Sequence, residues 1–254
     1  GNSIEFIMNL HNTTFVEAVQ YLAQKRKMTE HEPKEQRTLV ISAKVKTVME
    51  INNIAARYYF EQLRTNVGKQ GMNYLNGREV PEHIKSSFGL GYASGFGDGL
   101  YKLLKSKGYT ETAIMDSGLI SKSTKPGAKN PFYDKFWDRV VFPIFNEDGQ
   151  VIAFGGRVLD DSKPKYLNSS DTPAFQKRKN LFALNFAKNY SSDRLILCEG
   201  YMDVISLHAY GFENAVATLG TAITPEQARL MTKYTKQVVI CYDADEAGQR
   251  AAVK

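Results

Sequence analysis

The sequence predicts a protein of the α/β class, in which a basic α+β N-terminal subdomain precedes an α/β subdomain with a parallel sheet. The last third of the chain alternates short apolar strands with amphipathic helices, a pattern typical of a parallel sheet covered by helices. The preceding part mixes helices with a β-hairpin and carries many basic side chains. A length of 254 residues is sufficient for one large domain or two modest ones.

The N-terminal quarter is predicted to be helical with one interruption. Thr14 and Glu17 fit a capping box that begins a first amphipathic helix. Residues 26–37 are charged, contain Pro33 and lack an apolar period, so we interpret them as a linker. A longer helix is expected over about residues 43–64. The apolar stripe that predicts it consists of Val45, Met49, Ala56, Tyr59 and Leu63.

A hairpin is predicted in the middle of the chain. Residues 139–145 and 150–154 are apolar runs that flank a four-residue turn ending at Gly149. Pro143 cannot donate a ladder hydrogen bond, which indicates that its strand lies at an edge or contains a bulge.

The hairpin register brings two arginines together at its open end. Pairing about the turn places Arg139 within about one residue of Arg157. Two adjacent guanidinium groups repel each other unless an anion lies between them, which suggests an anion site. The alternative is that both arginines are solvated or paired with Asp138 and Asp160, and these residues alone do not decide between the two.

Three strands and three helices alternate in the last third. The strands are expected at residues 195–198, 215–219 and 237–242, and helices are expected from about residues 203, 224 and 246. The first and third strands read as buried. Thr224, Pro225 and Gln227 form an N-cap, a first-position proline and a capping box.

Carboxylates follow two of these strands. Glu199 comes directly after the first strand, and Asp243 and Asp245 come after the third. Ligands bind beyond the carboxyl ends of parallel strands, so these side chains are expected to gather at one edge with Asp203. Oxygen ligands favour Mg2+ or Mn2+, which suit phosphoryl transfer. For Asp203 alone, helix capping is an equally simple interpretation.

Charge and composition fit a polyanionic partner. The formal net charge is +6, and basic side chains are dense in the middle third. These are Lys122, Lys125, Lys129, Arg139, Arg157, Lys163, Lys165, Lys177, Arg178 and Lys179. The two cysteines form no disulfide framework, and we find neither a signal peptide nor a membrane-spanning run, so we expect a protein of the reducing cytoplasm with no membrane partner.

Several blocks of the sequence resemble one enzyme family. Residues 198–204 (CEGYMDV) and 243–248 (DADEAG) resemble the TOPRIM fold, which primases, topoisomerases and some nucleases share. Upstream blocks resemble the basic half of the catalytic domain of bacterial DnaG primases. These blocks are residues 74–92, 138–144, 154–158, 164–169 and 175–177. The fold that the resemblance implies is a TOPRIM-type α/β subdomain after a basic subdomain.

The resemblance implies a function and a site. It implies a bacterial DNA primase that synthesises short RNA primers from ribonucleoside triphosphates on a single-stranded DNA template, as a monomer that meets the replicative helicase through a C-terminal region. Glu199, Asp243 and Asp245 would bind catalytic Mg2+ or Mn2+, and Asp203 would support them. The residues that would hold template, primer or nucleotide phosphates are Arg78, Arg139, Arg157, Lys165, Tyr166, Asn168 and Lys177.

The resemblance also divides the chain. Residues 1–37 resemble the tail of a zinc-binding domain and a linker, residues 38–190 the basic subdomain, and residues 191–254 an incomplete TOPRIM subdomain. We find no Cys/His quartet, so zinc is expected only in a preceding domain. A further acidic pair of the family is expected beyond Lys254, and Ala244 stands where the family has glycine. This fragment is therefore expected to need its missing ends for activity.

Two alternatives remain. Another TOPRIM enzyme, such as a phage primase-helicase, a nuclease or a topoisomerase, would share the acidic blocks; a downstream helicase domain or a nucleophilic tyrosine would distinguish it. A non-catalytic nucleic-acid-binding module would keep the fold without the chemistry. Clustered carboxylates that bind no cation destabilise a fold, which argues against that module.

Overall fold

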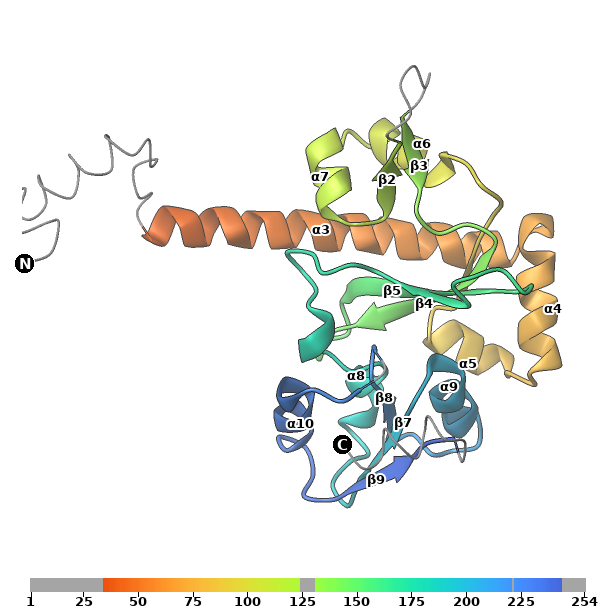
Figure 1. The fold of residues 1–254 in the computed structure, drawn as a ribbon, viewed down its shortest axis with the longest axis vertical. Helices are drawn as coiled ribbons and strands as arrows, with labels where there is room; N and C mark the ends of the chain where they lie inside the picture. Colours follow the sequence, from red (N-terminus) through yellow and green to blue (C-terminus); the bar gives the residue numbers. More distant parts are fainter. Residues whose placement is uncertain (1–33, 124–130, 221, 244–254) are drawn as a thin grey trace, which may run out of the picture. The chain divides into compact units, whose positions relative to one another are not determined.

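The computed structural model describes residues 34–123, 131–220 and 222–243, with side chains from residue 42 onward (Figure 1). Contacts divide the chain into two units, Gly1–Ala43 and Lys44–Lys254, and the second contains nearly all described elements. The predicted helix at Thr14, most of the linker, Asp245 and the helix near Glu246 lie outside the described residues. No helix of the described part is long and apolar enough to cross a membrane.

The long helix α3 spans Lys34–Leu63, so it begins earlier than predicted. Residues 34–37, interpreted as linker, are helical; Pro33 precedes the helix, where a proline is tolerated. The predicted stripe was partly wrong, since only Tyr59 and Leu63 of it are buried. The buried apolar positions are Val48, Ile51, Ala55, Tyr59 and Leu63, at the three- and four-residue spacing of one helical face.

Short elements follow α3. They are α4 Lys69–Gly77, α5 Glu82–Ser87, β1 Gly91–Ala93, α6 Gly99–Ser106, α7 Glu111–Asp116, β2 Ile120–Lys122 and β3 Phe132–Asp134. Thr110 caps α7 by accepting a hydrogen bond from the Ala113 N–H.

The central sheet has the strand order β1-β4-β5-β6, and its neighbouring strands are antiparallel. The predicted hairpin is confirmed as β4 Arg139–Phe145 and β5 Val151–Val158, and β6 is Tyr166–Asn168. The bulge expected near Pro143 lies between Ile144 and Phe145. β1 pairs only as far as Val141, so the missing N–H of Pro143 interrupts no ladder.

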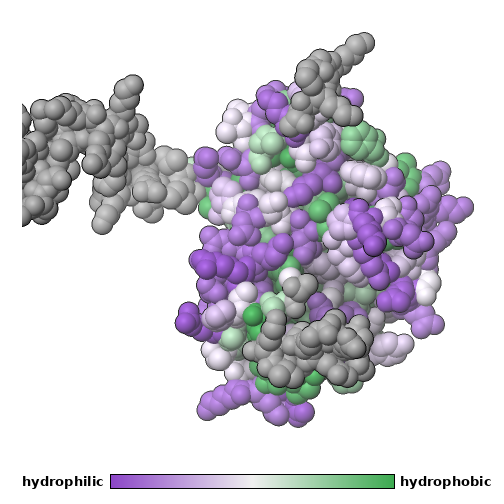
Figure 2. Space-filling view, viewed as in Figure 1, coloured by the Kyte–Doolittle hydropathy of each residue, from purple (hydrophilic) through white to green (hydrophobic). Residues whose placement is uncertain are grey.

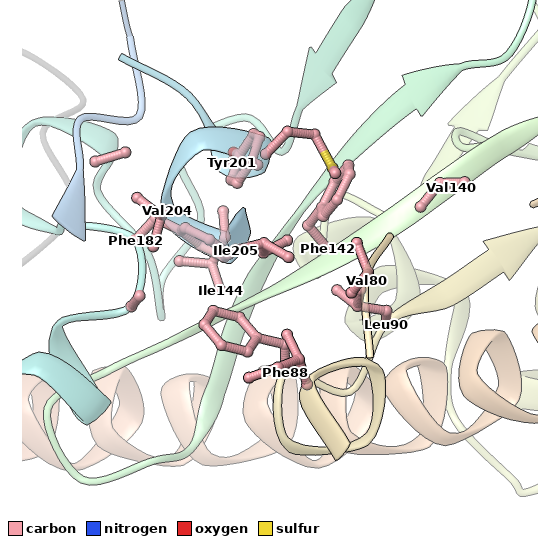
Figure 3. Packing of buried hydrophobic residues seen from close by; sticks show 14 of the residues in the cluster. Val80, Phe88, Leu90, Val140, Phe142, Ile144, Phe182, Tyr201, Val204 and Ile205 are labelled. Carbon is pink, nitrogen blue, oxygen red and sulfur yellow. The ribbon is translucent and has the colours of Figure 1, made fainter. Parts of the chain in front are cut away.

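Each face of this sheet buries a different core. Val141 and Phe154 pack with Ile51, Ala55 and Tyr59 of α3 on one face. On the other face, Val140, Phe142 and Ile144 meet Tyr201, Val204 and Ile205 from the following subdomain, and Phe88 and Phe182 close this cluster (Figure 3). β4 and β5 are therefore buried on both sides, which explains their almost uninterrupted apolar sequences.

The second sheet is parallel, as predicted, with the order β8-β7-β9. Its strands are β7 Leu195–Cys198, β8 Ala215–Ala217 and β9 Val238–Cys241. The helices of this part of the chain are η2 Lys177–Lys179, α8 Leu184–Ala187, α9 Tyr201–Ala209 and α10 Pro225–Met231. The α10 N-terminus has the predicted Thr224 cap and Gln227 capping box. Arg178 of η2 forms an ion pair with Glu226 of α10 at 2.9 Å.

The prediction that the third strand is buried was wrong. Val238, Val239 and Ile240 of β9 are 38–48% exposed, because β9 is the outer strand of this sheet within the described residues. Figure 2 shows a mostly hydrophilic face with apolar side chains scattered among the hydrophilic ones.

Tyr201 joins the two subdomains at a place that only glycine permits. Its ring stacks on Phe142 with centroids 5.0 Å apart and an angle of 4° between the planes. A Cβ on Gly155 would lie 2.5–2.7 Å from Tyr201 ring and hydroxyl atoms. The Tyr201 hydroxyl donates to the Asn168 Oδ1 at 2.7 Å, and the Asn168 amide nitrogen donates to the Leu219 carbonyl at 2.9 Å.

We predict that Gly155→Ala destabilises the chain, because the new methyl group must displace the Tyr201 ring from its stacked position. Overpacking of this kind costs about 1–3 kcal/mol of the free energy of unfolding, measurable by urea denaturation. Gly77→Ala is the matched control, since a Cβ there meets no atom within 4 Å and alanine favours a helix. Equal stability of the two variants would contradict the close approach.

We predict that His208 makes stability depend on pH. The imidazole is buried, its Nε2 lies 3.0 Å from the Ala215 carbonyl, and its ring packs against Phe88. Burial lowers the pKa of His208 below its ordinary value of 6.5, so the stability it contributes is present above pH 6.5 and is lost as the pH falls below it. The unfolding free energy of His208→Gln should therefore fall less between pH 7.5 and 5.5; equal pH dependence in both proteins would contradict the assignment.

Candidate functional site

Two of the predicted acidic residues follow neighbouring strands at the same edge of the parallel sheet. Cys198 of β7 and Cys241 of β9 are register partners in neighbouring parallel strands. Glu199 follows the first of these cysteines directly, and Asp243 follows the second by two residues. The strand arrangement predicted for the two carboxylates is therefore present.

Asp203 both caps a helix and faces the acidic edge. As the third residue of α9, it accepts a hydrogen bond from the Gly200 N–H at 3.0 Å, so the capping interpretation of this residue holds. Partial desolvation raises the pKa of its carboxyl group, and the neighbouring Asp243 carboxylate raises it further, whereas the Gly200 N–H and Arg78 lower it. The acidic pair and a basic residue thus interact electrostatically at one place.

The donor chemistry of this edge suits a hard divalent cation. Glu199, Asp203 and Asp243 offer only carboxylate oxygens, the ligands that Mg2+ and Mn2+ prefer. Within the described ranges, no three acidic, histidine or cysteine side chains are close enough to share an ion. Asp245, the third predicted ligand, lies outside the described residues, so the ligand set stays a prediction.

Arg157 lies between two tyrosines beside this edge. Its guanidinium carbon is 4.9 Å from the ring centroid of Tyr74 and 5.3 Å from that of Tyr166. The Arg157 Nη1 donates to the Tyr166 hydroxyl at 2.8 Å. Tyr166 is the register partner of Arg157 across β5 and β6, so the two side chains leave the same face of the sheet.

Of the two open interpretations of Arg139 and Arg157, the anion site between them is wrong. Val140, not Arg139, is the register partner of Arg157, so the predicted offset of one residue is confirmed. Because side chains alternate along a strand, that offset places the two arginines on opposite faces of the sheet. Arg139 is 4% exposed and donates to the carbonyls of Gly156 at 3.4 Å and Pro164 at 2.9 Å. Burial lowers its pKa, and the Asp160 carboxylate raises it.

Two other residues predicted to bind phosphates differ: Asn168 is hydrogen-bonded within the chain, and Arg78 is exposed. Both ends of the Asn168 amide are engaged, by Tyr201 and by the Leu219 carbonyl, so in this structure it joins the subdomains. Arg78 is exposed at the C-terminus of α4 and interacts electrostatically with Tyr74 and Asp203. Arg78 therefore connects the acidic edge to a basic wall around Arg157, which also includes Tyr74, Tyr166 and Lys165.

The two remaining lysines line separate cavities. Lys165 lines a cavity of about 530 Å³ with Tyr74, Arg157 and Lys163. Lys177 lines another of about 310 Å³ with Asp171 and Arg178. Desolvation lowers the pKa of Lys135, and the neighbouring charge of Lys177 lowers it further, so two cations lie together there.

Sequence reasoning did not single out Tyr74 or Lys135, and it named Lys163 only among the dense basic side chains. Tyr74 lay within a recognised block of sequence, but only the tertiary contact with Arg157 distinguishes it from a core tyrosine. Lys163 and Lys135 lie in loops without a local pattern.

Comparison with protein families places two models on this chain. Residues 58–188 match the N-terminal domain of the DNA primase catalytic core, and residues 196–254 match a Toprim-like family. Among individual proteins, a DNA primase of Clostridium acetobutylicum is 47% identical over 255 residues, which cover 100% of this chain and 42% of that protein. A DNA primase of Pseudomonas putida is 39% identical, covering 99% of this chain and 38% of that protein. The chain thus spans about two fifths of these relatives.

Solved structures give the same result. A DnaG primase catalytic domain bound to single-stranded DNA is 35% identical, with a TM-score of 0.76 over 84% of this chain and 66% of that chain. The zinc-binding and RNA polymerase domains of the Aquifex aeolicus primase are 34% identical, with a TM-score of 0.73 over 99% of this chain and 60% of that chain.

Proposed function

Since the chain belongs to the family of bacterial DnaG-type DNA primases, we propose that it forms part of the catalytic core of an enzyme that joins ribonucleotides into short RNA primers on single-stranded DNA. The observation that carries the proposal is that Glu199 and Asp243 follow the paired ends of β7 and β9. Arg78 interacts electrostatically with Asp203 at this end and with Tyr74, whose ring contacts Arg157. Carboxylates beside fixed cations are the arrangement that nucleotidyl transfer requires.

Glu199, Asp243 and Asp245 would hold the divalent ions, with Asp203 at their side. Bound Mg2+ or Mn2+ supplies alignment of a 3′-hydroxyl with an incoming triphosphate and offsets charge on the transferred phosphoryl group. Asp203 is fixed by the Gly200 N–H, so its carboxylate keeps its place at the start of α9. Arg78 offsets the mutual repulsion of Asp203 and Asp243.

The basic wall would hold strands and nucleotides. Tyr166 and Tyr74 fix the plane of the Arg157 guanidinium before a ligand arrives, which reduces the entropy lost on binding. The exposed side chains of Lys165 and Arg78 add charge without sequence selectivity. We leave Arg139 and Asn168 out of this wall, because the Arg139 Nη1 and both ends of the Asn168 amide hydrogen-bond to the chain itself.

The partners of the whole protein belong to the same proposal. Template DNA, ribonucleoside triphosphates and an RNA primer fit the charge of the wall. The replicative helicase, the monomeric state, the zinc of a preceding domain, the cytoplasmic setting and the predicted domain boundaries stay predictions.

We predict that Asp243→Ala, made in the full-length protein, lowers primer synthesis on single-stranded DNA at least about a hundredfold, because it removes a metal ligand. The measurement is incorporation of labelled ribonucleotides in the presence of Mg2+. Asp193→Ala is the matched control: Asp193 precedes β7 at the opposite edge of the same sheet, and its loss should leave synthesis unchanged. Undiminished synthesis by Asp243→Ala would refute the metal assignment.

We predict that Arg157→Ala weakens binding of single-stranded DNA and flattens its salt dependence. Losing one phosphate contact should reduce the slope of log K against log salt by about 0.7. Binding is measured by fluorescence anisotropy of a labelled oligonucleotide over a range of salt concentrations. Arg194→Ala, at the opposite edge of the parallel sheet, is the control. If the slope of Arg157→Ala equals that of the control, Arg157 contacts no phosphate.

A further inference from the structure

The cavity beside Arg157 has the size and charge of a ligand site. Its volume of about 530 Å³ lies within the range of about 300–1,000 Å³ that is usual for small-molecule pockets. One side is formed by Tyr74 of α4, and the other by the end of β5 and the connection to β6. Three of the side chains that line it are cationic, namely Arg157, Lys163 and Lys165.

Two hydrogen-bond donors in its wall have no acceptor. Within the described part of the chain, neither the Tyr74 hydroxyl nor the Arg157 Nε has a hydrogen-bond partner, although both atoms are buried from solvent. Buried donors are normally satisfied, so two such groups on neighbouring side chains indicate an acceptor that binds from outside the chain. The contact between the Arg157 guanidinium and the Tyr74 ring, at 4.9 Å, keeps the two donors together.

The carboxylates of the cavity do not supply that acceptor. Asp160 accepts hydrogen bonds from the backbone N–H and the hydroxyl of Ser162. Those bonds, ahead of its attraction to Arg139, lower the pKa of Asp160. The Asp160 carboxylate is therefore hydrogen-bonded within its own loop. Asp161 is exposed, and no hydrogen bond connects it to Tyr74 or Arg157 among the described contacts.

We propose that Tyr74 is a phosphate-binding and positioning residue of this wall. Its hydroxyl donates to an oxygen of a phosphate group that the Arg157 Nε also contacts, and its ring holds the guanidinium against Tyr166. Lys163 and Lys165 neutralise the remaining charge of the phosphate. The inference rests on the proposed function and adds to it a residue that acts through a neutral donor.

The loss of a neutral donor and the loss of a cation have different effects on the salt dependence of phosphate binding. A tyrosine hydroxyl carries no charge, so its removal weakens phosphate binding without changing the number of counterions released. The salt slope should therefore stay constant in Tyr74→Phe, although affinity falls at every salt concentration. A purely structural role of the hydroxyl would leave affinity unchanged.

The test compares Tyr74→Phe with Tyr59→Phe in the full-length protein. Tyr59 also has a buried hydroxyl without a partner among the described residues, but it lies on the buried face of α3, in the core. Neither substitution should lower the melting temperature, because each removes an unsatisfied buried group. We expect Tyr74→Phe to bind a labelled thymidine oligonucleotide about tenfold more weakly, and Tyr59→Phe to bind it like the unaltered chain.

A second arm identifies the source of the phosphate. Binding of ATP by both variants is measured by calorimetry under the same conditions. A loss for the oligonucleotide alone assigns the site to a strand phosphodiester, and a loss for ATP alone assigns it to a nucleotide; both outcomes support the proposal. Unchanged binding of both probes by Tyr74→Phe overturns it.

The outcome is independent of the metal site. Oligonucleotide binding is measured without divalent ions, so a failure at Tyr74 leaves the prediction for Asp243 intact. Conversely, loss of binding in Tyr74→Phe together with full primer synthesis by Asp243→Ala would refute the metal assignment and retain the phosphate site.

Discussion

The contact between Tyr201 and the central sheet determines how the two halves of the site lie relative to each other. Tyr201 is two residues after Glu199 and begins α9, so its position fixes the acidic edge. Gly155, over which its hydroxyl lies, is two residues before Arg157 and on the same face of β5. One ring therefore fixes the carboxylates relative to the basic wall.

Several interactions hold this ring. It stacks on Phe142, meets Phe182 edge to face at 4.7 Å, and donates its hydroxyl to Asn168, the register partner of Gly155. Burial raises the pKa of Tyr201 well above its ordinary value, so the phenol stays protonated and remains a donor. Removing such a fully packed aromatic side chain from a core costs about 3–5 kcal/mol. The two subdomains are therefore closely packed at this ring.

Local patterns predicted the elements, and register predicted much of the site. The hairpin, the parallel strands and the α10 cap follow from apolar periods and capping residues that act within a few positions. The position of Glu199 and Asp243 follows from strand ends. The error at Arg139 came from treating residues that are offset by one position as neighbours. Because side chains alternate along a strand, that offset places the Arg139 and Arg157 side chains on opposite faces of the sheet.

What sequence reasoning could not reach depends on tertiary contacts. Asn168 has a polar side chain that could bind a ligand. Only the position of Leu219, 51 residues later, shows that its amide nitrogen hydrogen-bonds to the chain itself. Tyr74 and Arg157 are 83 positions apart, and nothing local in either segment indicates that they meet. The exposure of β9 likewise depends on which strands flank it, and not on its apolar sequence.

The most direct test of this arrangement is a crystal structure of the protein with Mn2+ and a single-stranded oligonucleotide, with anomalous diffraction recorded at the manganese edge. We expect manganese beside both Glu199 and Asp243, a strand phosphate in contact with Arg157, and the Tyr201 ring still stacked on Phe142. Manganese bound elsewhere, or a strand that passes on the Arg139 face of the sheet, would contradict it.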